Sequence, residues 1–260
     1  MHGEGWWAQE SSGVRLEWGL TGAERLAPGR KGWLVVVDVL SFTTAVDVAT
    51  ERGTRVLPYP WRDDTAAAFA TRHRAALAVG RRQVSPSAPW SLSPAALRDA
   101  PFVPRLVLPS PNGSTIAATA SSRGSQVVAA CLRNAGAVAR WLAGQGAGTS
   151  GEPVTLVPAG ERWPDASLRP ALEDLLGAGA VAAALSELGA GPLSPEACAA
   201  RASYLAVDPA AALTDCSSGR ELRVCGFAED VAIAAEVGAS TSVPLLAGGA
   251  FTDAAADRNW

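Results

Sequence analysis

The chain has 260 residues, of which 48% are hydrophobic and 18% charged, and its formal net charge is −3. This composition supplies ample apolar material for a core and argues against a disordered chain. No run of basic residues interleaves with aromatic residues, so a nucleic-acid partner is not expected. Four cysteines form no CxxC pair and only two histidines are present, which excludes a zinc site of ordinary ligand spacing. Any metal should be bound through oxygen.

The first residues lack the basic start and apolar segment of a signal peptide. The longest uncharged stretch, 106–122, is interrupted by Pro109, Pro111 and Asn112. We therefore predict a cytoplasmic protein with no membrane segment. Scattered tryptophans are compatible with the interface of a homo-oligomer as well as with a core.

Short apolar segments alternate with alanine-rich segments, a pattern typical of strands alternating with helices. It predicts a three-layer α/β/α fold whose mainly parallel or mixed sheet is covered on both faces. Strands are expected at 34–40, 54–59, 75–80, 105–110, 126–131 and 153–159. Helices are expected from about Thr43 to Gly53 and at 63–74, 114–121, 134–146, 168–191 and 194–206, and short extended segments near 220–225 and 241–246.

The segment 144–153 is rich in glycine and serine and predicts a flexible loop. We expect a single domain over 1–260, with a possible subdivision at this loop. The glycines of "GAGAVA" (177–182) mimic a dinucleotide-binding motif but lie inside a helical segment, not after a strand. They indicate close helix packing.

Polar side chains follow four of the predicted strands, at the points where helices should begin. In open α/β sheets ligands bind at such places, where free N–H groups and the helix dipole favour anions. Arg133 and Arg162 would add bidentate positive charge. Helix capping is the commoner role for Thr43, Asn112 and Ser114, each taken alone. The four segments are 38–44, 110–115, 131–134 and 160–162.

Asp38 follows an unbroken apolar run, where a carboxylate is costly unless it is paired or bound to a metal. A structural aspartate that caps the following turn is the alternative. Glu173 and Asp174 are adjacent carboxylates after Pro170. One of them is expected to face the site and the other solvent, and an acidic first turn favoured by the helix dipole is the alternative.

Several phosphatase and nucleotide-binding signatures are missing. A cysteine phosphatase needs arginine six positions after Cys131, where this chain has Ala137. An aspartyl phosphatase of the haloacid dehalogenase type needs a second aspartate two positions after Asp38, where this chain has Leu40. No GxxxxGK[ST] segment occurs.

Five motifs, in order, resemble those of the 2-phosphosulfolactate phosphatase family, known as ComB-like proteins. The resemblance implies a ComB-like α/β fold. It also implies a magnesium-dependent phosphoric monoester hydrolase that converts 2-phospho-3-sulfolactate to 3-sulfolactate on the route to coenzyme M. Many members carry arginine in the first motif, where this chain has Ser41 and Phe42. The motifs are "VVVDVLSFTTAV" (35–46), "SPNGST" (110–115), "CLRNA" (131–135), "PAGER" (158–162) with "EDLLGAGAV" (173–181), and 217–246.

On these positions we predict that Asp38 and one of Glu173 or Asp174 bind Mg²⁺ through oxygen, and that all three are catalytic. Arg133 is predicted to hold an anionic group of the small substrate. Whether Asp38 is a ligand, a general base or a nucleophile stays open. The predicted substrate contacts are Ser41, Thr43, Thr44, Asn112, Gly113, Ser114, Asn134 and Arg162.

Two other functions stay open at the level of sequence. The same scaffold could act as a hydrolase or lyase on a different small phosphorylated or sulfonated acid. Alternatively, the polar turns could belong to a non-enzymatic module that only binds anions. Turnover of phosphate esters separates these possibilities.

Overall fold

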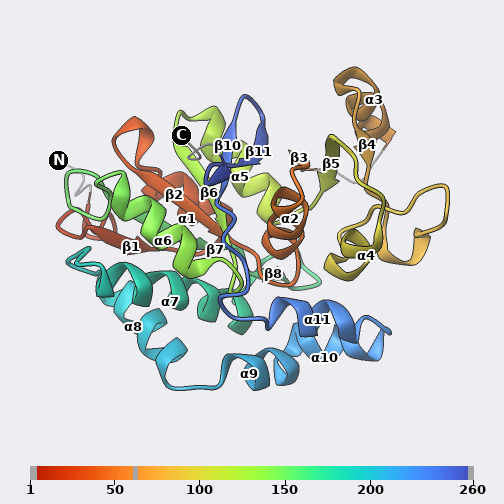
Figure 1. The fold of residues 1–260 in the computed structure, drawn as a ribbon. Helices are drawn as coiled ribbons and strands as arrows, with labels where there is room; N and C mark the ends of the chain where they lie inside the picture. The colour runs from red at the N-terminus through yellow and green to blue at the C-terminus, as the bar shows by residue number, and fades with distance from the viewer. Residues whose placement is uncertain (1–4, 61–63, 257–260) are drawn as a thin grey trace.

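The computed structural model describes residues 5–60 and 64–256, and Figure 1 shows their fold. Within these residues a nine-stranded mixed sheet has the order β1-β7-β2-β6-β10-β11-β3-β5-β4, and β8 and β9 form a separate pair. The strands are β1 (Val14–Leu16), β2 (Trp33–Val37), β3 (Arg55–Tyr59), β4 (Ala76–Leu77), β5 (Arg105–Pro109), β6 (Gln126–Ala130), β7 (Val154–Pro158), β8 (Glu161–Arg162), β9 (Leu168–Arg169), β10 (Pro244–Ala247) and β11 (Ala250–Asp253).

Helices lie on both faces of the sheet, which confirms the predicted α/β class. Two short 3₁₀ turns, Gly29–Lys31 and Arg81–Gln83, add to them. The helices are α1 (Gly19–Leu26), α2 (Phe42–Glu51), α3 (Asp64–His73), α4 (Pro94–Asp99), α5 (Gly113–Ser122), α6 (Ala135–Gly144), α7 (Leu172–Glu187), α8 (Pro195–Leu205), α9 (Pro209–Asp215), α10 (Ser217–Val224) and α11 (Ala228–Ala234).

The sheet consists of two parallel groups joined by an antiparallel hairpin. β1, β7, β2 and β6 are parallel neighbours, and so are β3, β5 and β4. The hairpin of β10 and β11 lies between the groups and pairs antiparallel with β6 on one side and β3 on the other. Three successive antiparallel pairings mean that the two groups run in opposite senses. The sheet is therefore mixed.

Strand β2 lies inside the first parallel group and all five of its residues are buried. Its side chains alternate between the two faces, as in any strand. Val35 and Val37 pack in a core with α6, α7 and α8, whereas Leu34 and Val36 pack in a second core with α2, α4 and α5. The continuous apolar run before Asp38 thus reflects a strand covered on both faces.

Two of the predicted segments are wrong in type or extent. Residues 220–225 were expected to be extended, but Ser217–Val224 form α10, where Ser218, Gly219 and Leu222 recur with helical spacing on its packed side. The helix expected from residue 168 begins at Leu172, because Leu168–Arg169 pair with Glu161–Arg162 as β9 and β8. Residue 63 of another predicted helix lies outside the described residues.

The glycines of the "GAGAVA" segment serve helix packing, as predicted. Gly179 lies on α7, and a Cβ atom at this position would be 2.2 Å from the carbonyl oxygen of Ala200 on α8. Ser194 caps α8, its hydroxyl accepting the N–H of Ala197. Among the described residues no helix combines the length and apolar character needed to cross a membrane.

We expect Gly179→Ala to lower the free energy of unfolding by about 1–3 kcal/mol, because the added methyl group would force α7 and α8 apart. Denaturant titration measures this. Gly136→Ala in α6 is the matched control, since its Cβ would approach only the mobile end of Arg140 at 3.3 Å. It should be neutral or slightly stabilising. Equal effects of the two substitutions would contradict the packing assigned to Gly179.

Candidate active site

Asp38 lies directly after β2 and only 8% of its surface is exposed. Its carboxylate accepts N–H groups from two helices: Oδ1 from Phe42 at 3.2 Å and Oδ2 from Gly113 at 2.9 Å. Phe42 and Gly113 are the first residues of α2 and α5. The carboxylate thus satisfies free N–H groups at two helix N-termini, where the dipoles favour negative charge. The capping role considered for Asp38 is observed.

Gly113 has to be glycine for this contact to form. A Cβ atom there would lie 2.4 Å from Cδ1 of Phe42 and 2.8 Å from Oδ2 of Asp38. The Phe42 ring is fully buried and packs edge-on against Phe251, with ring centroids 6.2 Å apart. In the Ser41–Phe42 pair, the phenylalanine is therefore a core residue that forms the floor beneath Asp38.

Asp174, in the first turn of α7, has a similar arrangement. Its Oδ1 accepts the N–H of Val39 and its Oδ2 that of Gly160, each at 2.8 Å. Glu173 is buried as well, with 2% of its surface exposed, and lies against the Cys216 thiol. The expectation that one of the two carboxylates would face solvent is wrong, because backbone donors hold Asp174 inside and Glu173 is covered by the start of α10.

Four carboxylates come together at this place, and we call Asp38, Glu161, Glu173 and Asp174 the acidic cluster. Burial raises the pKa of Asp38 and Asp174 above their usual range, and the charge of Glu173 raises both further. Burial, together with the charges of Asp38 and Glu173, raises the pKa of Glu161 to about 7. The cluster therefore concentrates more negative charge than its surroundings offset.

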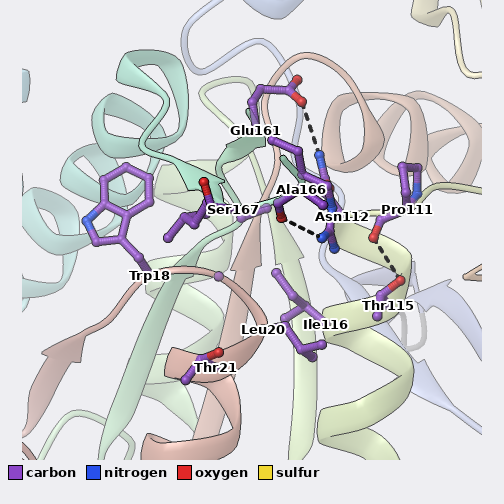
Figure 2. Close-up of a pocket in the computed structure, with 14 residues that line it drawn as sticks. Trp18, Leu20, Thr21, Pro111, Asn112, Thr115, Ile116, Glu161, Ala166 and Ser167 are labelled. Carbon is purple, nitrogen blue, oxygen red and sulfur yellow. Dashed lines mark hydrogen bonds between the residues drawn. The ribbon is translucent and has the colours of Figure 1, made fainter. Parts of the chain in front are cut away.

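A pocket of about 330 Å³ borders the acidic cluster between α1, the start of α5 and the β8–β9 turn (Figure 2). Trp18 and Ile116 contribute apolar wall, and Asn112, Glu161 and Arg162 contribute polar wall. The Asn112 amide donates to Oε2 of Glu161 at 3.2 Å, and its oxygen accepts from Nε of Arg162 at 3.3 Å. A small molecule in this pocket would contact Glu161 directly.

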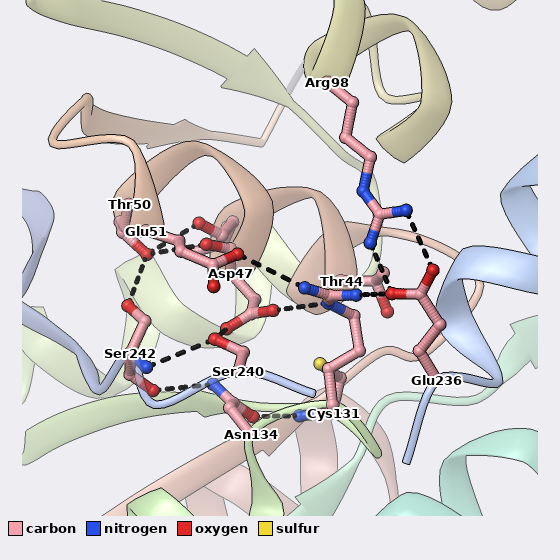
Figure 3. A network of polar contacts seen from close by, with 12 residues as sticks. Thr44, Asp47, Thr50, Glu51, Arg98, Cys131, Asn134, Glu236, Ser240 and Ser242 are labelled. Atoms are coloured by element: carbon pink, nitrogen blue, oxygen red, sulfur yellow. Dashed lines mark hydrogen bonds and ion pairs between the residues drawn. The ribbon is translucent and has the colours of Figure 1, made fainter. Parts of the chain in front are cut away.

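Arg133, predicted to hold a substrate anion, is buried in a separate polar network (Figure 3). Its Nε donates to Asp47 at 2.8 Å, its Nη2 donates to Glu51 at 3.2 Å, and its Nη1 pairs with Glu236. Asp47 also accepts the Ser240 hydroxyl at 2.7 Å. In this structure the guanidinium is engaged by carboxylates on both sides and joins α2 to the segment after α11.

The remaining predicted contacts are mostly bonded to nearby backbone. Asn112 occupies the N-cap position of α5 without capping it through its side chain, and Thr43 and Ser114 lie within helices. The capping alternative is therefore wrong for these three side chains. The observed bonds run from Thr43 to Asp38, from Thr44 to Val39, from Ser114 to Leu108, and from Asn134 to Ala129 and Ser242.

Two arginines that the sequence analysis did not single out lie beside the acidic cluster. Arg81 donates to the Ser41 hydroxyl, and Arg169 donates to the Ser218 hydroxyl at 3.3 Å. Burial dominates the pKa of Asp38 and Glu161, but the charge of Arg81 lowers the first and that of Arg169 lowers the second. No local motif marks either arginine, because tertiary contacts alone bring them here.

A comparison with protein families agrees with the motifs on which the site is built. The model described as 2-phosphosulpholactate phosphatase matches residues 23–249. The chain belongs to this family. As a 2-phosphosulpholactate phosphatase family member it is a phosphoric monoester hydrolase, and the match includes each member of the acidic cluster.

The acidic cluster fits Mg²⁺ in the chemistry of its donors, which are oxygen atoms whose negative charges destabilise one another. In the described part of the chain no three Asp, Glu, His or Cys side chains converge closely enough to enclose a metal ion by themselves. Mg²⁺ commonly binds through one or two carboxylates, several waters and a substrate phosphate. The acidic cluster thus provides oxygen donors of the kind that Mg²⁺ prefers but not a closed cage.

We expect Asp47→Ala to lower the free energy of unfolding by about 3 kcal/mol, because it leaves the buried Nε of Arg133 without its partner. Urea titration of the purified protein measures the change. Glu51→Ala removes a carboxylate that is 43% exposed from the same guanidinium and should cost less than about 1 kcal/mol. A loss as small for Asp47→Ala as for Glu51→Ala would show that the network does not stabilise the fold.

Proposed function

We propose that the protein hydrolyses the phosphate ester of a small acid that carries a second anionic group, 2-phospho-3-sulfolactate or a close relative, to release phosphate. Family membership supports phosphatase chemistry, and the chemistry of the site supports an anionic substrate. Glu161 of the acidic cluster and Arg162 line a small pocket, and the other carboxylates of the cluster raise the pKa of Glu161. A substrate such as 2-phospho-3-sulfolactate, which has a carboxylate and a sulfonate besides its phosphate, matches this combination of charges.

The observation that carries the proposal is the fixed position of Asp38. Two N–H groups hold its carboxylate, and neither can move without moving a helix. Phosphoryl transfer relies on positioning and electrostatic stabilisation, so a reacting or ligating carboxylate gains from being held in advance. This geometry suits Asp38 as ligand, base or nucleophile.

Glu161 is the group best placed to move a proton. With a pKa of about 7 it is partly protonated at neutral pH, and it lines the pocket in which the ester would lie. The Asn112 amide fixes one of its oxygens. A protonated Glu161 can donate to the oxygen that leaves as the ester bond breaks, the role of a general acid.

Asp38 and Glu173 are the residues we propose to hold Mg²⁺, and Glu161 is left to carry its proton. Both oxygens of Asp174 already accept short backbone bonds, so Asp174 is better suited to orient the loop after β2 than to bind the ion. Mg²⁺ bound there would shield the charge of the phosphoryl oxygens. Phosphate release from 2-phosphosulfolactate, measured beside phospholactate and phosphoglycolate with and without EDTA, tests the substrate and the metal together.

We expect Asp38→Asn to lower kcat by at least about 100-fold, because the amide loses the charge and places a donor against an N–H group. Phosphate release at saturating Mg²⁺ measures this. Asp215→Asn, which changes an aspartate that is 70% exposed, should retain normal activity. Full activity of Asp38→Asn would exclude all three roles of Asp38.

Mg²⁺ affinity should rise with pH between about 6 and 8. Below its pKa of about 7 Glu161 holds a proton, and the proton opposes a cation at the acidic cluster. Above that pKa the carboxylate is charged and favours the cation. Calorimetric titration with MgCl₂ at several pH values measures the trend, and Glu161→Gln should weaken binding above pH 7 and flatten it. Affinity independent of pH would contradict this linkage.

A further inference from the structure

Arg81 stands out among the charged side chains that the proposed reaction does not yet use. It lies in the 3₁₀ turn Arg81–Gln83, far from Ser41 in sequence, and its side chain is 17% exposed. Its Nη2 donates to the hydroxyl of Ser41, in the turn between Asp38 and α2. A positively charged side chain is thus placed at the first motif of the site.

Two residues at the start of α11 fix the side chain of Arg81. Its Nε donates to Oδ2 of Asp230 at 2.9 Å, and its guanidinium lies over the Phe227 ring, 5.7 Å from the centroid. Asp230, 1% exposed, is itself anchored by the N–H of Ala95 at 3.2 Å and by the Ser93 hydroxyl. Residues of α11 and of the start of α4 therefore set where this guanidinium points.

A guanidinium offers five N–H donors in a planar fork. The contacts described for Arg81 use the donor on Nε, to Asp230, and one donor on Nη2, to Ser41. Planar forks match carboxylate and sulfonate oxygens better than a point charge does. The Asp230 contact is made through Nε, and the described hydrogen bonds use neither Nη1 nor the second donor of Nη2.

We propose that Arg81 is a specificity-determining residue that binds an acid group of the substrate other than the phosphate, a carboxylate or sulfonate, and that Asp230 positions it. This inference rests on the proposed function, since it takes the phosphate to lie at the acidic cluster. It assigns the recognition of a non-phosphate acid group to the turn Arg81–Gln83, which lies outside the motifs on which the site was predicted, and its positioning to Asp230 on α11, which lies within the last of them.

The test compares binding and turnover in Arg81→Gln, Arg81→Lys and wild type. Arg81→Gln should weaken binding of 3-sulfolactate, measured by calorimetry, by about 10- to 100-fold, the effect of losing charge-assisted hydrogen bonds. Binding of inorganic phosphate should change less than about threefold. Arg81→Lys should recover only part of the loss, because the ammonium cannot form the planar fork.

In turnover, KM for 2-phosphosulfolactate should rise in Arg81→Gln with little change in kcat, and hydrolysis of ethyl phosphate, which has no second acid group, should be nearly unaffected. Asp230→Asn should show the same selectivity to a smaller degree. Arg82→Gln is the matched control, since the neighbouring Arg82 is directed to Cys225 on the exposed side. Its kinetics should match wild type.

Two results would overturn the role of Arg81 while leaving the phosphatase activity standing: equal losses of turnover on both esters, or unchanged 3-sulfolactate binding in Arg81→Gln.

Failure of the wild type to hydrolyse any ester would reject the proposed function. The binding arm would still decide whether Arg81 reads the acid group, and absence of 3-sulfolactate binding to wild type would overturn that role as well. Circular dichroism spectra and melting temperatures confirm that the variants are folded.

Discussion

The two backbone bonds to the Asp38 carboxylate are the constraint on which the site depends. They join the end of β2 to the first residues of α2 and α5, so the positions of three elements are set by one side chain. Gly113 permits the approach because any larger residue would collide with Phe42. Asp174 acts in the same way, because its carboxylate accepts N–H groups from the segments after β2 and β7 and so joins them to α7. The same bonds that build the fold therefore fix the carboxylates.

The structure contains two networks of charged side chains, one around Arg133 and one in the acidic cluster. They differ in whether the carboxylates are paired with an arginine. Around Arg133 one guanidinium meets three carboxylates, two of which are partly exposed, and every charge has a short partner. In the acidic cluster the carboxylates are close to one another and mainly bonded to neutral groups, so their pKa values rise. The network around Arg133 joins α2 to the segment after α11. For the acidic cluster we propose that a cation and an anionic substrate complete it, since carboxylates with perturbed pKa values are common in active sites.

The sequence predicted the architecture well because alternation of apolar strands and alanine-rich helices is a local signal. The unbroken run ending at Asp38 correctly indicated a strand covered on both faces. The antiparallel hairpin and the opposite directions of the two strand groups could not be predicted. The residue pattern of a strand does not indicate which distant strand it pairs with. α10 was misassigned because the packed side of this short helix consists mostly of small residues, Ser218 and Gly219 beside Leu222, which give a weak apolar signal.

The site was predicted in part. Asp38, Glu173 and Asp174 do come together, since strand ends and helix starts are readable from composition. In the sequence, Arg133 stands after a strand, as a substrate-binding arginine would. Its pairing with Asp47 and Glu236 depends on tertiary packing, which the sequence does not show. Arg81 and Arg169 reach the site through long-range contacts and carry no local mark.

The hairpin of residues 244–253 has a consequence for how the chain folds during synthesis. It is the only pairing in the described sheet that links the group containing β6 with the group containing β3. Both groups emerge from the ribosome much earlier, and each then presents an open edge with unpaired N–H and C=O groups. Closing the sheet depends on a segment that emerges after both groups, so the nascent chain is exposed to aggregation in the interval before the hairpin appears.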